Sequence, residues 1–112
     1  MILKEFLNLW LETYIYPNRA RKTGDAYFYA LAHLDPATQN TELDELTPIA
    51  LQKQVNTLNA KYPRQAQLMY LGLRAALKKA VALGMMQNRP MENVEAPHHE
   101  KREISYLTPA EA

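Results

Sequence analysis

The sequence lacks cysteine and has only three glycines and one serine among its 112 residues. Without cysteine it forms neither a disulfide nor a thiolate zinc site, which agrees with a reducing cytoplasm. Three scattered glycines cannot build a glycine-rich phosphate loop, and Ser105 lacks the flanking glycines of a nucleophile elbow. No apolar run approaches the roughly 18 residues of a membrane span, and charge at Lys4 and Glu5 comes too early for a signal peptide. We therefore expect a cytoplasmic protein with no membrane partner.

Side chains suited to catalysis or metal binding are also scarce. His33 falls in a predicted helix, whereas His98 and His99 fall in a charged segment with no further ligands nearby, and two adjacent histidines alone do not indicate a metal site. Several of the seven tyrosines fall at helical apolar spacing, which is typical of core or rim positions. The sequence thus predicts no catalytic residue, no metal, no cofactor and no small-molecule substrate in this chain.

Acidic residues are missing from one long stretch. Residues 46–91 carry seven basic residues and no acidic one, whereas residues 1–45 carry seven acidic residues and four basic ones. The net charge of +1 for the whole chain hides this asymmetry. The distribution fits a surface that faces a polyanion, and it equally fits a solvated helical face, so charge alone favours neither interpretation.

Apolar spacing predicts an all-α bundle of four to five helices, and the length fits one domain. Apolar residues recur at three- and four-residue steps in the predicted helices, which cover residues 2–15, 24–34, 48–61 and 64–83. Thr23 and Thr47 are the predicted N-caps of the second and third helices, and Gly84 is the predicted C-cap of the fourth. Residues 35–46 are polar and acidic, which predicts a surface loop.

The composition changes towards the end of the chain. Residues 95–104 are charged and lack apolar periodicity, which predicts an interdomain linker. After them, Thr108, Pro109 and Glu111 form the capping-box pattern that opens a helix. We expect residues 1–94 to form one helical domain and residues 105–112 to be the start of a following domain.

Several segments occur in an order shared with a known family. They are Trp10-Leu11, the basic turn before Thr23, Val55-Asn56-Leu58, residues 80–85, Asn88-Arg89-Pro90 and residues 107–111. Together they resemble the core-binding domain of tyrosine recombinases, the phage integrase family. The resemblance implies a SAM-like helical domain, joined by a linker to a catalytic domain that would begin at residues 105–112.

In that family the two domains close around duplex DNA at the crossover site, and further recombinase protomers join a synaptic assembly. The resemblance therefore implies double-stranded DNA and other protomers as partners. The catalytic residues belong to the second domain, so none is assigned here and Tyr106 is not taken as the nucleophile. The chain by itself should not cleave DNA.

Two segments are predicted to contact DNA on chemical grounds. Residues 19–23 are basic and end at a predicted helix N-terminus, where free N–H groups and the helix dipole favour a phosphate. The helix of residues 64–83 presents arginine and glutamine, which suit base edges, and lysine, which suits the backbone. The predicted DNA-binding residues are Arg19, Arg21, Lys22, Thr23, Arg64, Gln65, Gln67, Arg74 and Lys78.

Other interpretations remain open from the sequence. Arg19 pairing with Asp25 would account for part of the basic turn without DNA. Leu68 and Leu71 on the outer half of the last helix would suit a protein–protein adaptor that does not bind DNA. A helix-turn-helix regulator is disfavoured, because no short helix pair is joined by a glycine turn.

Overall fold

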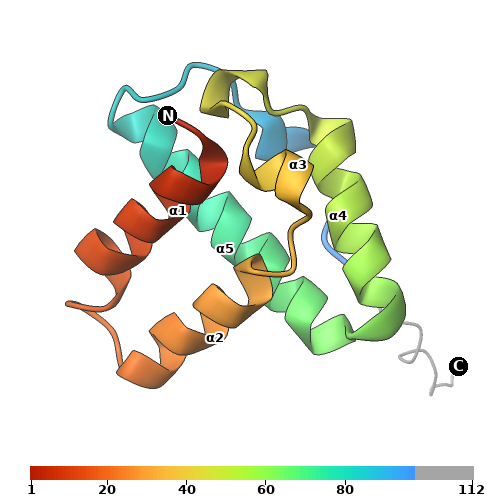
Figure 1. The fold of residues 1–112 in the computed structure, drawn as a ribbon, viewed down its shortest axis with the longest axis horizontal. Helices are drawn as coiled ribbons and strands as arrows, with labels where there is room; N and C mark the ends of the chain where they lie inside the picture. The colour runs from red at the N-terminus through yellow and green to blue at the C-terminus, as the bar shows by residue number, and fades with distance from the viewer. Residues whose placement is uncertain (98–112) are drawn as a thin grey trace, which may run out of the picture.

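The computed structural model describes residues 1–97, and their regular structure is helical apart from an isolated bridge between Ile2 and Glu42 (Figure 1). The α-helices are α1 (Leu3–Trp10), α2 (Arg21–Leu31), α3 (Pro36–Gln39), α4 (Pro48–Lys61) and α5 (Pro63–Ala82). Shorter turns are the π-helical η1 (Leu11–Ile15) and the 3₁₀ turns η2 (Leu43–Glu45) and η3 (Pro90–Asn93). The expected all-α class is confirmed.

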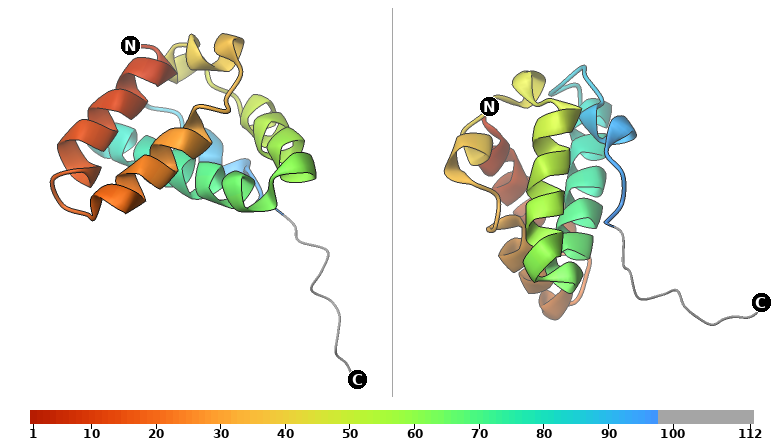
Figure 2. Two further views of the ribbon diagram at one scale, coloured as in Figure 1. Left: turned by 60° about the horizontal axis from the view of Figure 1, so that its bottom comes forward. Right: turned by 90° about the vertical axis from the view of Figure 1, so that its right-hand side faces the viewer.

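Helix α5 is the centre of the domain, because α1, α2, α4 and η3 all contact it. It runs across the molecule behind α1 and α2 (Figures 1 and 2), and α4 packs against it from the lower right, where α5 begins (Figure 1). One side of α5 is buried and consists of small and apolar residues that include Ala66, Met69, Leu73 and Ala76. Most residues on the opposite side are exposed.

Gly72 allows α2 to approach α5 closely. A Cβ at this position would lie 3.2 Å from the Tyr27 ring and 3.4 Å from a methyl group of Leu31, both on α2. The missing side chain therefore sets the distance between the two helices that carry most of the predicted DNA-binding residues.

The limits of α4 and α5 follow from local chemistry, and the predicted caps Thr47 and Gly84 are found at their expected places. The Thr47 hydroxyl accepts a hydrogen bond from the N–H of Ala50 at 3.2 Å, with Pro48 in the first helical position. Pro63 likewise opens α5. Gly84 follows the end of α5 with a φ of 76°, a left-handed conformation that favours glycine.

We expect Thr47→Ala to lower the free energy of unfolding by about 1 kcal/mol, because one N–H of the first turn of α4 loses its acceptor. Urea denaturation followed by circular dichroism measures the change. Thr57→Ala is the matched control, since Thr57 is exposed on the same helix, and alanine there should be neutral or slightly stabilising. Equal losses in the two variants would contradict the capping role.

Two sequence-based expectations about local structure are wrong. Helix α2 begins at Arg21 with Ala20 as its N-cap, so Thr23 lies inside the first turn and does not cap it. Residues 35–46 are not simply a loop, because they contain α3 and η2. The Asp35 carboxylate caps α3 by accepting from the N–H of Thr38 at 2.8 Å.

Long-range contacts explain why residues 35–46 are ordered. The Gln54 side chain on α4 donates to the Asp35 carboxylate at 2.9 Å, and it accepts a hydrogen bond from the backbone N–H of Asp35 at 3.0 Å. Hydrogen bonds from the side chain and backbone N–H of Thr38, with a further one from Gln54, hold the pKa of Asp35 below its usual value. Leu43 and Leu46 then pack into the core.

The described residues include the predicted end of the helical domain at residue 94. Val94 is buried in the core, and Pro97 is the last residue that the structure describes. Most of the predicted linker at residues 95–104, and all of the predicted start of a further domain at residues 105–112, lie outside the described residues. His98 and His99 lie outside them too.

Candidate nucleic-acid interface

The first turn of α2 carries exposed cations and free backbone donors. Arg21 and Lys22 are exposed and Thr23 is half-buried, with its N–H donating to the carbonyl of Ala20 at 3.0 Å. Ala20 offers no side-chain cap. Across residues 1–97, no acceptor faces the N–H groups of Arg21 and Lys22. This end of α2 therefore presents positive charge and two unsatisfied donors to solvent.

One acidic residue stands next to these cations. Asp25 accepts a hydrogen bond from the Tyr16 hydroxyl at 2.8 Å, and its second oxygen lies 3.9 Å from Nε of Arg21. The hydrogen bond to the Asp25 carboxylate raises the pKa of the Tyr16 hydroxyl above its ordinary value near 10. The alternative that Arg19 pairs with Asp25 is wrong, because Arg21 makes that pair.

The solvent side of α5 carries a row of residues at three- and four-residue steps, which therefore share one face of the helix. The members of this row, here called the α5 row, are Arg64, Gln67, Leu71, Arg74 and Lys78. All are exposed except Gln67, which is half-buried. No acidic residue occurs between residues 46 and 91 to oppose these charges.

The start of α5 resembles the start of α2 in its free donors. Tyr62 provides no side-chain cap and Pro63 has no N–H to offer. The N–H groups of Arg64 and Gln65 meet no acceptor in the part of the chain that the structure describes. By contrast, α3 and α4 are capped by the side chains of Asp35 and Thr47.

Gln65 differs from the other predicted contacts. Its side-chain oxygen Oε1 is buried and has no hydrogen-bond partner among residues 1–97. The amide oxygen thus points into the domain and away from the solvent face of α5. Of the predicted set, Gln65 is the residue whose side chain the structure turns inward.

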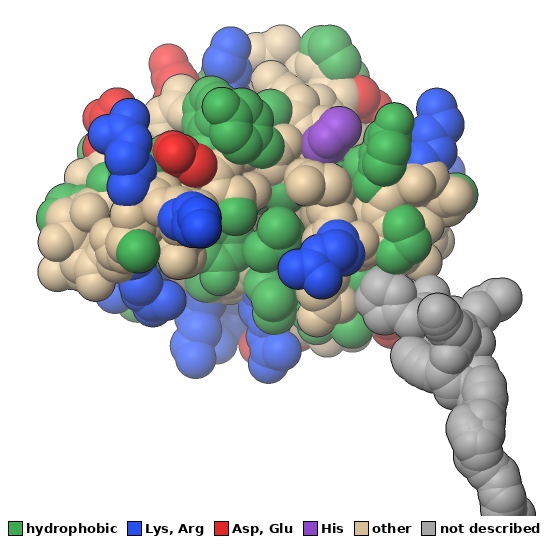
Figure 3. Space-filling model, turned by 90° about the horizontal axis from the view of Figure 1, so that it is seen from below, with side chains coloured by type: hydrophobic (Ala, Val, Ile, Leu, Met, Phe, Trp, Pro, Cys, Tyr) green, Lys and Arg blue, Asp and Glu red, His purple; other side chains and the backbone are tan. Residues whose placement is uncertain are grey.

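Apart from Arg19, the predicted residues lie on two helices that pack against each other. Helices α2 and α5 both begin at the lower edge of the molecule in Figure 1, at its left and right ends. Seen from below, lysine and arginine side chains lie across the width of this face, with hydrophobic side chains between them (Figure 3). Arg21 is the only member of the predicted set that forms an ion pair within residues 1–97.

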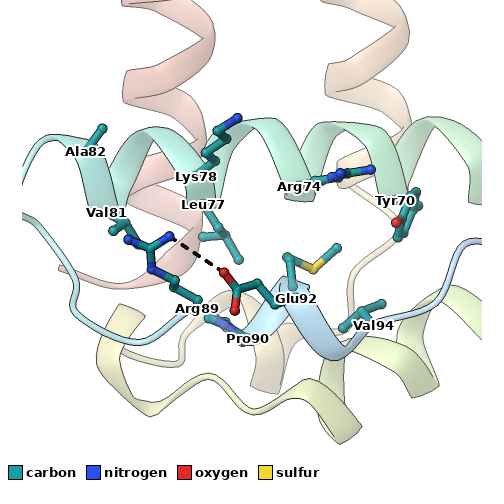
Figure 4. Close-up of a pocket in the computed structure, with 11 residues that line it drawn as sticks. Tyr70, Arg74, Leu77, Lys78, Val81, Ala82, Arg89, Pro90, Glu92 and Val94 are labelled. Atoms are coloured by element: carbon teal, nitrogen blue, oxygen red, sulfur yellow. Dashed lines mark ion pairs between the residues drawn. The ribbon is translucent and has the colours of Figure 1, made fainter.

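A hollow of about 630 Å³ lies beside the α5 row, between α5 and η3. Arg74 and Lys78 stand on its α5 side, and Arg89 stands on the opposite side, 3.6 Å from Glu92 (Figure 4). Arg89 is not in the predicted set, although it belongs to the acid-free stretch and to the Asn88-Arg89-Pro90 segment of the family resemblance.

The two leucines that would suit an adaptor differ in their burial. Leu68 is half-buried and packs against the core, so it is not a free docking residue. Leu71 is 38% exposed and lies within the α5 row, between cations. The described part of the chain contains no cluster of metal-binding side chains and no helix both long and apolar enough to cross a membrane.

Comparison with known proteins places the chain in a family. A family model of the phage integrase N-terminal SAM-like domain matches residues 2–59, just over half of the chain. These residues run from α1 through most of α4 and include the start of α2. No curated protein and no solved structure gave a significant match. The match confirms the resemblance seen in the sequence, and the chain therefore belongs to the phage integrase N-terminal SAM-like domain family.

Proposed function

We propose that this chain is the core-binding domain of a phage-type integrase, which clamps duplex DNA at the crossover site for a separate catalytic domain. The observation that carries the proposal is the exposed charge on α2 and α5. Arg21 and Lys22 in the first turn of α2, and the arginines and lysine of the α5 row, face solvent with one weak ion pair among them.

The first turn of α2 is suited to hold a phosphate. Its two free N–H groups point out of the helix end, where the dipole favours an anion, and Arg21 and Lys22 add two full charges beside them. The Thr23 hydroxyl is not used as a cap, so it is available to a phosphate oxygen. Arg19, exposed in the preceding turn, would add a further backbone contact.

The α5 row is suited to lie along a DNA groove. An α-helix fits the major groove, and arginine and glutamine near its start are the side chains that best recognise guanine and adenine edges. Arg64 and Gln67 would have this role, whereas Arg74 and Lys78, further along, would set the register on the phosphates. Gln65, whose side-chain oxygen is buried, would contribute mainly through its free N–H.

The role in recombination follows from this binding. Strand cleavage would belong to the catalytic domain that the resemblance places downstream, and this domain would position it for DNA integration. Other protomers of the same recombinase would be its partners in the synaptic assembly.

Duplex binding at graded salt concentrations tests the proposal. If about six cations contact phosphates, a plot of log affinity against log salt should have a slope of about −5. The measurement is fluorescence anisotropy of a labelled duplex between about 50 and 200 mM salt. No binding at about 50 mM salt with protein near 0.1 mM would contradict the proposal, since non-specific binding alone is typically at least that strong, and would favour the adaptor.

A further inference from the structure

The first turns of α2 pack against the chain segment that precedes them. Tyr16, directly after η1, lies against Gly24 on α2. A Cβ on Gly24 would lie 2.5 Å from Cε1 of Tyr16, closer than real atoms approach. Only glycine therefore leaves room for the tyrosine ring in this place.

The Tyr16 hydroxyl then fixes Asp25, and Asp25 faces Arg21. One carboxylate oxygen of Asp25 accepts from the hydroxyl at 2.8 Å, and the other lies 3.9 Å from Nε of Arg21, one helical turn earlier. Arg21 has no other partner in the described residues, and its side chain is 86% exposed. Among the described residues, the Asp25 carboxylate is thus the one charged partner of this guanidinium.

We propose that Tyr16 positions the Arg21 guanidinium for its phosphate contact by fixing the Asp25 carboxylate between them. Tyr16 and Asp25 are then positioning residues, and Gly24 makes their arrangement possible. This inference rests on the proposed DNA-binding function. An arginine that is already oriented loses less side-chain entropy when DNA binds, so affinity is gained without a new contact.

Tyr16 is a better position for a test substitution than Asp25, because its hydroxyl is neutral. Changing Asp25 also removes a negative charge that repels phosphates, and this gain would mask a loss of orientation. Tyr16→Phe leaves every charge in place and deletes one hydrogen bond. We expect it to weaken duplex binding about two- to fivefold, the size typical of an exposed charged contact.

The matched control is Tyr29→Phe, which removes a hydroxyl from an exposed tyrosine on the same helix, α2. It should leave the affinity unchanged. Each variant is also made in an Arg21→Ala background, where Tyr16→Phe should have no effect because the side chain it orients is gone. A purely structural role for Tyr16 would give the same loss in both backgrounds.

A second measurement works without DNA. The NMR resonance of Arg21 Nε–Hε should move in Tyr16→Phe and in Asp25→Asn and stay in place in Tyr29→Phe. The inference is overturned if the resonance does not move, if Tyr16→Phe binds like Tyr29→Phe, or if its loss persists without Arg21. Should the unmodified chain bind no duplex, the proposed function fails, and the resonance alone decides whether Tyr16 orients Arg21.

Discussion

Replacing Arg21, Lys22 and Arg64 together by alanine is expected to weaken duplex binding about 100-fold at low salt. Each lost phosphate or base contact costs about 1 kcal/mol, and three such losses together correspond to about a 100-fold weaker affinity. The three side chains are exposed and lie in the first turns of α2 and α5. Alanine is the best helix former, so the fold should persist. Circular dichroism checks the fold, and anisotropy measures the affinity.

The salt dependence separates a defined surface from net charge. Arg21 and Lys22 are assigned to phosphates and Arg64 to a base edge, so the two lost phosphate contacts should make the slope of log affinity against log salt shallower by about 2. The control is Lys4→Ala with Lys53→Ala, which removes exposed cations from α1 and α4. If this pair costs as much affinity per charge, the binding surface is not the one formed by α2 and α5. An adaptor would show no DNA binding to lose.

The largest expected loss of stability is for Leu73→Ala. Leu73 is fully buried at the middle of α5, where α1, α2 and α4 surround the helix. Truncation removes apolar contacts and leaves a cavity, which costs about 2–5 kcal/mol. A domain of this size has about 5–15 kcal/mol in total, so the variant should be partly unfolded well below the midpoint temperature of the original chain.

Leu71→Ala is the matched comparison, since it makes the same change two residues away on the same helix. Leu71 is 38% exposed, so we expect a loss below about 1 kcal/mol. Urea denaturation of both variants gives the two free energies. Similar losses would contradict the assignment of Leu73 to the buried side of α5 and of Leu71 to its exposed side. Because Leu71→Ala stays folded, it also tests whether this leucine contributes to DNA binding.

The helices whose limits were predicted correctly are those whose ends depend on neighbours in the sequence. Thr47 caps α4 through the N–H three residues later, and Pro48 opens that helix without needing a donor. These effects act over one turn and do not depend on the rest of the fold. The apolar stripe of α5 was likewise readable, because burial of one face follows from periodicity.

The start of α2 was mispredicted because residue type alone favours Thr23 as the cap, whereas the helix extends back to Arg21. The Tyr16 ring packs on Gly24 inside the first turn, a contact that no local capping pattern indicates. The order of residues 35–46 has a similar cause, since Gln54 on α4 holds Asp35 in place. Propensity is a weak prior where such contacts compete with it.

The amino-acid sequence by itself determined the all-α class, the buried face of α5 and the family, because these depend on periodicity, local caps and residue order. Only the tertiary structure decided which charges become neighbours. Helix packing decides three features of the site: α2 approaches α5 closely at Gly72, the Gln65 side-chain oxygen is buried, and Arg89 lies opposite Arg74. That packing is set by side-chain shapes that meet across the chain, and no local pattern encodes it.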